Sequence, residues 1–276
     1  MRCQWDFWSR GSARLLVERV YHWLSMSFGS TNAPSTFQRA LDISLSGLNW
    51  HIYLVYLDNV IIFSANAEQH VKDVDTVLHS LREAGVTLNL EKCTLFSDEV
   101  EYLGHNVRPG QLHVHSKNVD ALRHEKFPIT KTQLKSFLGM CNVYRRFVTD
   151  FAKRAKPLNA LTRGEIPHDL PPPTDAAVAA FEDLCHALLF PPVLASPKAN
   201  RKLIGDVDAC ADQVRCTLLQ EEQGDLLHPV GYWSRGLTAA EQNYSTTERE
   251  CLGVVRGVLK LRRFLNGERF LIQTDH

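Results

Sequence analysis

The sequence predicts an α+β protein, because short β-branched runs of strand length alternate with longer segments of helical periodicity. A Pro-rich stretch at 164–174 separates an earlier part of the chain from a later one. The length of 276 residues suits roughly two domains. We therefore expect two packed parts joined by a linker.

The earlier part predicts a helix, a hairpin, a second helix, a second hairpin and further helices. Pro34 favours a helix start, since proline suits the first helical position. The apolar runs 51–56 and 60–64 flank Asp58 and Asn59, which tolerate the left-handed conformations of tight turns and so predict a β-hairpin. The other expected elements are an end of the first helix at Leu48, a helix through 71–81 with Gly85 as its stop, strands at 94–96 and 100–103, and two or three helices within 117–161.

The later part predicts an α/β layer. A long helix is expected over 239–264, because Thr238 and Glu241 have the spacing of a capping box. The other expected elements are an Ala-rich helix at 175–190 and strands at 202–207, 214–220, 229–234 and 270–274.

Charge is distributed unevenly along a chain whose formal net charge is zero. Segment 131–163 contains eight basic residues and one acid, Asp150. Such a block is typical of an element that follows nucleic-acid phosphates, although a solvated helix face is an alternative explanation. Zero net charge itself argues against a generally basic nucleic-acid binder.

Other sequence features narrow the class of protein. Seven scattered cysteines without CxxC spacing argue against a zinc site or a disulfide framework. The N-terminal residues do not resemble a signal peptide, and no run approaches the roughly 20 apolar residues of a membrane span. We expect an intracellular protein of the cytoplasm or nucleus that has no membrane partner and is not secreted.

Four stretches of the earlier part carry a resemblance to a known family. They are FGSTNAPSTFQ at 28–38, YLDNVIIFS at 56–64, EYLGH at 101–105, and LKSFLGM through YRRF at 134–147. In this order they resemble the nucleotide-side motif, the catalytic hairpin, the primer-gripping hairpin and the thumb of gypsy-type LTR retrotransposon reverse transcriptases. In the later part DVDA at 206–209, YWSR at 232–235, YSTTERECL at 244–252 and TDH at 274–276 resemble the RNase H domain of the same elements.

The resemblance implies a fold and a function. It implies a partial palm and a helical thumb, followed by a truncated RNase H-like α/β domain whose closing helix would lie beyond residue 276. The implied domains are partial fingers and palm at 1–115, thumb and connection helices at 116–163, a linker at 164–174 and the RNase H-like domain at 175–276. The implied activity is RNA-directed DNA polymerase with RNase H. The implied partners are RNA template, primer–template, RNA–DNA hybrid and deoxynucleotides.

The resemblance also implies metal chemistry. In-line displacement at phosphorus uses two divalent cations, and Mg²⁺ or Mn²⁺ requires oxygen ligands. The implied catalytic residues are Asp58, Asp6, Asp208, Glu250 and Asp275, and all of these except Asp6 are the implied metal ligands. The implied substrate-binding residues are Phe28, Gly29, Gln38, Tyr56, Asn59, Lys135, Arg145 and Arg146.

Several departures from the family pattern predict impaired activity. Asn59 stands where the family has a second Asp, and only 22 residues separate Asp6 from Gly29, which is shorter than the family spacing. Gln213 and Arg215 replace two glycines, so we expect backbone strain there. Two alternatives remain open: a non-catalytic nucleic-acid-binding remnant that uses the basic segment, or an expressed pseudogene product.

Overall fold

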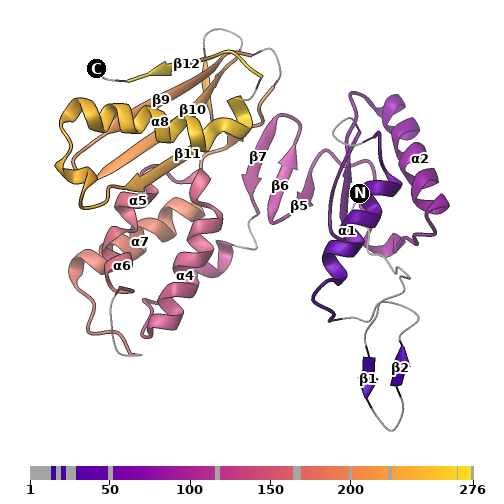
Figure 1. Ribbon diagram of the computed structural model, residues 1–276, viewed down its shortest axis with the longest axis horizontal. Coiled ribbons are helices and arrows are strands. Elements are labelled where there is room, and N and C mark those ends of the chain that lie inside the picture. Colours follow the sequence, from indigo (N-terminus) through magenta and orange to yellow (C-terminus); the bar gives the residue numbers. More distant parts are fainter. Residues whose placement is uncertain are drawn as a thin grey trace. The chain divides into compact units, whose positions relative to one another are not determined.

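The computed structural model describes residues 14–16, 20–22, 29–48, 52–115, 119–163, 169–198, 201–222, 226–265 and 267–274. The chain divides into two compact units, Met1–Tyr102 and Leu103–His276 (Figure 1). Helices and sheets occur in both, which confirms the predicted α+β class. Each unit is described separately.

The first unit is built around a hairpin and two helices. Its elements are β1 (Arg14–Leu16), β2 (Val20–His22), α1 (Ala33–Ser44), β3 (Tyr53–Tyr56), β4 (Asn59–Ile62), α2 (Ala67–Glu83), the 3-10 helix η1 (Leu90–Lys92) and β5 (Val100–Tyr102). The predicted helix start at Pro34 and the predicted hairpin are confirmed. Gly85 has a φ of 71° just after α2, as expected of a helix stop. Its core contains Leu41, Leu45, Tyr53, Val60 and Val77.

Three expectations for the first unit were wrong in detail. Helix α1 ends at Ser44, before the predicted end at Leu48. The hairpin turn places Leu57 at a φ of 52°, so a leucine adopts the left-handed conformation that we assigned to Asp58 and Asn59. The predicted strand at 94–96 is absent, and the segment follows the 3-10 helix η1, which the Asn89 side chain caps by accepting a hydrogen bond from the backbone N–H of Glu91. Phe96 then interrupts the extended run with a φ of 50°.

Most helices of the second unit share one hydrophobic core. They are η2 (Ala121–His124), α4 (Lys131–Val143), η3 (Arg145–Phe147), α5 (Phe151–Arg154), α6 (Lys156–Ala160) and α7 (Asp175–Leu189). Buried side chains in this core include Leu134, Phe137, Leu158, Phe181 and Leu184. The helix α7 follows the Pro-rich segment but packs with helices that precede it. The domain boundaries implied by the resemblance therefore stay a prediction, and they do not coincide with the packing of α7.

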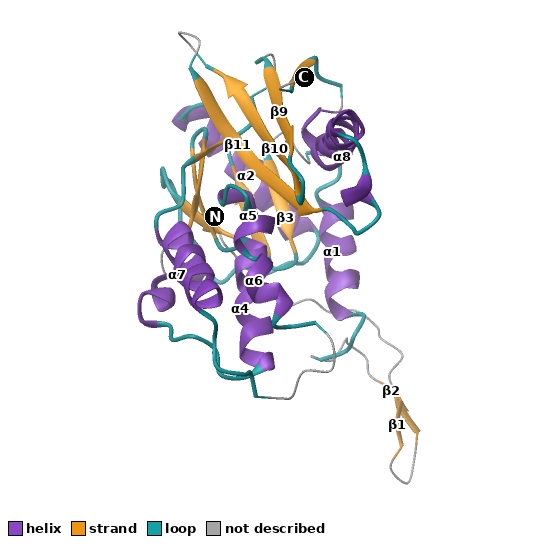
Figure 2. Ribbon diagram, turned by 90° about the vertical axis from the view of Figure 1, so that its left-hand side faces the viewer, coloured by secondary structure: helices purple, strands orange, loops and turns teal. Residues whose placement is uncertain are grey.

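Two sheets complete the second unit. In one, β6 (His105–Arg108) pairs with β7 (Gln111–Val114), which pairs with β8 (Leu194–Ala195). The other has the order β11-β10-β9-β12 and is formed by β9 (Leu203–Ala209), β10 (Gln213–Glu221), β11 (Leu227–Gly236) and β12 (Phe270–Gln273). Helix α8 (Thr246–Leu265) packs on β9 and β10 (Figure 2). The four strands predicted here are confirmed.

The long helix starts later than predicted. Thr238 and Glu241 do form the reciprocal bonds of a capping box, at 2.8 and 3.3 Å, but these bonds lie at the start of the short 3-10 helix η4 (Glu241–Asn243) and not of α8. A second pair, Ser245 and Glu248, makes the same two bonds at 2.8 and 3.3 Å. The predicted start at 239 was therefore wrong, because the second capping box begins a new helix at Thr246.

Candidate functional site

Asp58 lies at the tip of the β3–β4 hairpin. Tyr56 pairs with Asn59, which leaves Leu57 and Asp58 as a two-residue loop. Favoured loops of this length require a positive φ at the first central position, and Leu57 meets that requirement with a φ of 52°. A branched side chain is disfavoured in this conformation. The tight loop leaves the Asp58 side chain exposed at the tip of the hairpin.

Gln38 fixes the hairpin tip from helix α1. Its side-chain oxygen accepts a 2.6 Å hydrogen bond from the backbone N–H of Leu57. Its amide nitrogen donates to Asp42 at 3.0 Å, which orients the amide group. The residue predicted to bind substrate is therefore also a support for the loop that presents Asp58.

Asn59 contacts Asp58 directly. The Asn59 side-chain amide donates a 3.3 Å hydrogen bond to the Asp58 carboxylate. A carboxylate at position 59 would repel Asp58 in the absence of a cation. The amide therefore supports a hairpin tip that needs no bound metal to balance its charge.

Of the other residues predicted for this site, two are exposed and two lie outside the described residues. Tyr56 has 54% of its surface exposed, and Gly29 is exposed with a φ of 85°. Asp6 and Phe28 lie outside the described residues. The structure therefore brings together Gln38, Asp58 and Asn59 from the predicted set, and their roles in substrate binding and catalysis stay predictions.

Glu250 connects three chain segments of the later site. Its carboxylate accepts a 3.3 Å bond from the backbone N–H of Ala209 and a 2.9 Å bond from the hydroxyl of Thr274. Ala209 directly follows Asp208, and Thr274 directly precedes Asp275, which is itself outside the described part of the chain. The predicted carboxylates Asp208 and Glu250 thus lie at one end of the sheet. Thr274 belongs to the TDH stretch that carries the resemblance, but its bond to Glu250 was not predicted from the sequence.

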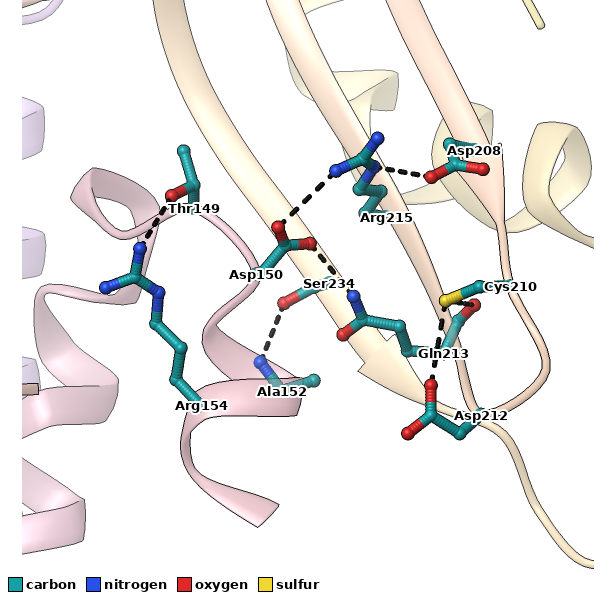
Figure 3. Close-up of polar contacts among 10 residues, drawn as sticks. All are labelled: Thr149, Asp150, Ala152, Arg154, Asp208, Cys210, Asp212, Gln213, Arg215 and Ser234. Atoms are coloured by element: carbon teal, nitrogen blue, oxygen red, sulfur yellow. Dashed lines mark hydrogen bonds and ion pairs between the residues drawn. The ribbon is translucent and has the colours of Figure 1, made fainter. Parts of the chain in front are cut away.

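Asp208 is held by an arginine of the neighbouring strand. Asp208 and Arg215 are opposite each other in the antiparallel β9–β10 pair, and Arg215 Nε lies 2.7 Å from Asp208 Oδ2. The same guanidinium reaches Asp150 at 3.4 Å. Gln213 also donates to Asp150, at 2.9 Å (Figure 3). Sequence reasoning missed this use of Asp150, which lies 63 residues before Gln213 and carries no local signal.

The backbone strain expected at Gln213 and Arg215 was wrong. Neither residue has a positive φ, and both lie in the regular part of β10, paired with β11 on one side. An extended strand accepts any side chain at these positions. Gln213 and Arg215 therefore fit the strand without strain, and their side chains contact Asp150.

Arg145 and Arg146 join the helical part of the second unit to β11. Arg145 donates to the Ser234 carbonyl at 2.6 Å, and Arg146 donates to the Val230 carbonyl at 3.2 Å. Burial lowers the pKa of both arginines, yet both remain cations at neutral pH. Lys135 is exposed on α4. Substrate binding by these three residues stays a prediction, and the two arginines already serve as structural contacts.

A basic pocket of about 680 Å³ adjoins these contacts. Its lining includes the cationic side chains of Arg145, Lys153, Lys156, Arg163 and Arg235, together with one acid, Asp212. Lys156 and Asp212 form an ion pair at 2.9 Å. The pocket keeps a surplus of positive charge, which suits an anionic group such as a phosphate.

The described residues offer no preformed metal cluster. Nowhere in this part of the chain do three His, Cys, Asp or Glu side chains come together to hold an ion. Asp58 and Asn59 provide one carboxylate and one amide oxygen, which suit a hard cation but are few. The residues around Asp208 fit a metal less well, because Arg215 occupies one of its carboxylate oxygens.

Comparison with known proteins agrees with this geometry. The family described as reverse transcriptase (RNA-dependent DNA polymerase) matches residues 4–107, and the RNase H-like domain found in reverse transcriptase matches residues 174–272. The chain belongs to the reverse transcriptase and RNase H region of retroelement Pol polyproteins. The predicted family is thereby confirmed, and its gypsy-type assignment is consistent with the relatives.

The curated relatives of this reverse transcriptase segment are much longer. It is 35% identical to the retrovirus-related Pol polyprotein from transposon opus of Drosophila melanogaster, over 93% of this chain and 26% of that protein. It is 29% identical to the transposon Tf2-7 polyprotein of Schizosaccharomyces pombe, over 93% of this chain and 19% of that one. The segment thus spans about a quarter or less of the length of these relatives.

Solved structures support the same fold. The foamy viral protease-reverse transcriptase in complex with an RNA/DNA hybrid has a TM-score of 0.81 and 22% identity, covering 92% of this chain and 34% of that chain. The reverse transcriptase and RNase H families generally use divalent metals. In the parts that the structure describes, every helix is too short or too polar to cross a bilayer.

Proposed function

We propose that this segment supplies the palm, thumb and RNase H-like parts of an RNA-directed DNA polymerase. Its substrates would be deoxynucleotides and its partners RNA template, primer–template and RNA–DNA hybrid. The observation that carries the proposal is the placement of Asp58 at the tip of a tight hairpin that Gln38 holds from α1. These partners occur in the cytoplasm and nucleus, where the proposed activity would take place.

Asp58 is proposed as the carboxylate that binds the metal on the polymerase side. Mg²⁺ or Mn²⁺, when bound, would neutralise charge on the phosphate oxygens during in-line displacement. The exposed Asp58 side chain offers oxygen ligands to such a cation. Gln38 keeps the loop in place by accepting the hydrogen bond from the Leu57 backbone N–H. The exposed Tyr56 beside it is proposed to contact the substrate.

We propose that Asn59 weakens this activity. The amide is neutral, so the hairpin tip has one negative charge fewer for the attraction of cations. The 3.3 Å bond from Asn59 also engages one Asp58 oxygen. Extension by the native chain should therefore be slow and should benefit from Mn²⁺, which binds N and O ligands more tightly than the hard, strongly hydrated Mg²⁺.

Primer extension on an RNA template tests the proposal. The native chain is compared with Asp58→Ala under Mn²⁺, with the exposed Asp75→Ala on α2 as a control for loss of one surface carboxylate. We expect weak extension that falls by about a hundredfold or more in Asp58→Ala and is unchanged in Asp75→Ala. Equal extension by native chain and Asp58→Ala would remove Asp58 from the mechanism.

A second candidate function is nucleic-acid binding without catalysis. It is favoured by the basic segment 131–163 and by the pocket lined with Lys153 and Arg163. Phosphate contacts release counterions, so affinity should fall with salt, and each lost contact should reduce the logarithmic slope by about 0.9 on a duplex.

Fluorescence anisotropy with an RNA–DNA hybrid tests the second candidate. Lys153→Ala should weaken binding and flatten the salt dependence, while Asp58→Ala should leave binding intact. The control is Lys72→Ala, which removes an exposed lysine of α2. Binding no tighter than that of serum albumin at low salt would contradict both candidates.

A further inference from the structure

Arg215 lies between two carboxylates from different parts of the second unit. Its Nε is 2.7 Å from Asp208 on β9, and its terminal nitrogen is 3.4 Å from Asp150, just before α5. The close-up shows the guanidinium pointing to both carboxylates (Figure 3). Two carboxylates facing one positive charge is the arrangement expected around a bound cation. Here the positive charge is the guanidinium of Arg215.

The surroundings leave little for a divalent ion. Mg²⁺ binds a carboxylate oxygen at about 2.0–2.1 Å, and the Asp208 oxygen already has a guanidinium nitrogen 2.7 Å away. An ion on that oxygen would lie close to a like charge. The two oxygens of Glu250 accept bonds from Ala209 and Thr274. Within the described ranges, no three potential ligands surround a common point.

Asp150 is positioned for this contact by its backbone. It has a φ of 52° directly before α5, a conformation that Asp adopts more readily than most residues. Its second oxygen accepts the 2.9 Å bond from Gln213. Next to it, Ala152 donates its backbone N–H to the Ser234 hydroxyl at 2.9 Å. Two residues of β10 and one of β11 therefore hold the start of α5.

We propose that Arg215 is a built-in cation of the RNase H-like sheet, which neutralises Asp208 in place of a divalent ion and ties it to Asp150. The proposal rests on the proposed function only in taking Asp208 as a carboxylate that a metal would otherwise use. It makes this end of the sheet independent of metal for its folding. It also removes from this end of the sheet the divalent ion on which nuclease chemistry at Asp208 would depend.

The electrostatics agree with a permanent cation. Burial, the largest single influence, lowers the pKa of Arg215, but the carboxylates of Asp208 and Asp150 outweigh it and the net pKa is raised. The side chain of Arg215 is 48% exposed, and that of Asp208 is 28% exposed. The pair is therefore reachable by ions from solvent, so replacing Arg215 should open the site.

Mn²⁺ binding followed by electron paramagnetic resonance tests the proposal. All proteins carry Asp58→Ala, so that the hairpin contributes no metal signal and failure of the polymerase proposal cannot affect the result. With Arg215 present, we expect no Mn²⁺ bound at Asp208. Arg215→Ala should gain one bound ion, and Asp208→Asn added to Arg215→Ala should remove it again. Arg262→Ala, a change of an exposed arginine on α8, is the matched control.

Thermal unfolding gives a second readout. Saturating Mn²⁺ should leave the Tm of the Arg215-containing protein unchanged and raise that of Arg215→Ala by about 5–10 °C at a hundredfold excess over Kd. Arg215→Gln, which keeps hydrogen-bond donors without charge, replaces Arg215→Ala if the latter does not fold. Mn²⁺ bound at Asp208 with Arg215 intact, or no gain of Mn²⁺ in either variant, would overturn the proposal.

Discussion

The side-chain oxygen of Gln38 lies 2.6 Å from the backbone nitrogen of Leu57 and accepts its hydrogen bond. Leu57 is in the left-handed conformation, which costs a branched residue about 1–3 kcal/mol and persists only where the surroundings hold it. Gln38 is one part of those surroundings, 19 residues away in the sequence. The first family motif thus supports the second through this contact.

Replacing Gln38 by Leu should loosen the hairpin tip. The Leu57 N–H would lose its partner in a half-buried position, and we expect a loss of about 0.5–1.5 kcal/mol in the free energy of unfolding. Urea unfolding measures this loss. Arg39→Leu changes an exposed neighbour on α1 and should be nearly neutral. A Gln38→Leu protein as stable as Arg39→Leu would show that the bond does not support the loop.

Gly253 allows α8 to pack closely on the sheet. A Cβ at this position would lie 2.9 Å from Cγ1 of Val207 and 3.4 Å from Cγ1 of Val214, whereas a Cβ at Gly139 of α4 would meet nothing within 4 Å. Overpacking costs about 1–3 kcal/mol, which exceeds the roughly 1 kcal/mol that Ala gains over Gly in a helix. Gly253→Ala should therefore destabilise the protein.

Gly139→Ala is the matched control for that prediction. The gain in helix propensity is unopposed at this position, so chemical denaturation should show stabilisation of about 0.5–1 kcal/mol. The two Gly→Ala changes should thus have opposite signs. Stabilisation by both would mean that the helix shifts freely on the sheet.

His105 should make stability depend on pH. Its ring stacks on Phe147 with centroids 5.6 Å apart, and burial, followed by the charge of Arg146, lowers the pKa of His105 below 6.5. The unfolded chain therefore takes up the proton first. The contribution of the neutral His105 ring to the free energy of unfolding is fully present above about pH 6.5. It is lost as the pH falls toward the pKa that His105 has in the folded protein.

Urea midpoints at pH 7.5 and 5.5 measure this effect. His105→Phe keeps an aromatic ring and cannot protonate, so its midpoint should fall less between the two pH values than that of the native chain. The two proteins share all other histidines, so the effect of those residues on the midpoint is the same in both. Equal falls for the two proteins would exclude His105 as the source.

Substitutions of Arg145 and Lys135 should have different effects, because Arg145 makes a structural contact and Lys135 is proposed to contact nucleic acid. Arg145→Ala removes the 2.6 Å bond to the Ser234 carbonyl, and a hydrogen bond from a charged donor contributes about 1.5–3 kcal/mol. Lys135→Ala changes an exposed side chain and should leave stability within about 0.5 kcal/mol, while it weakens hybrid binding. Loss of hybrid binding without loss of stability in Arg145→Ala would reverse this assignment.

Local patterns predicted much of the fold. The β3–β4 hairpin, the start of α1 at Pro34 and the four strands β9–β12 follow from periodicity and turn residues, which act over a few positions. The capping-box pattern at Thr238 was also correctly found. It misplaced the helix only because Ser245 and Glu248 repeat the pattern seven residues later.

Long-range contacts could not be predicted in this way. Asp150 interacts with Gln213 and Arg215, more than 60 residues away, and nothing in its neighbours indicates these partners. The left-handed Leu57 contradicts residue preferences and depends on Gln38. The residue types at the candidate sites were predictable from the resemblance, but the neutralisation of Asp208 by Arg215 required the folded arrangement of β9 and β10.

The most direct test of the proposed function is primer extension on an RNA template with Mg²⁺ by Asn59→Asp, measured beside the native chain and the double variant Asp58→Ala/Asn59→Asp. A second carboxylate should strengthen cation binding at the hairpin tip. We predict that Asn59→Asp extends the primer faster than the native chain and that Asp58→Ala abolishes the gain. No extension by Asn59→Asp, or equal extension by the double variant, would contradict the assignment of this hairpin as a polymerase site.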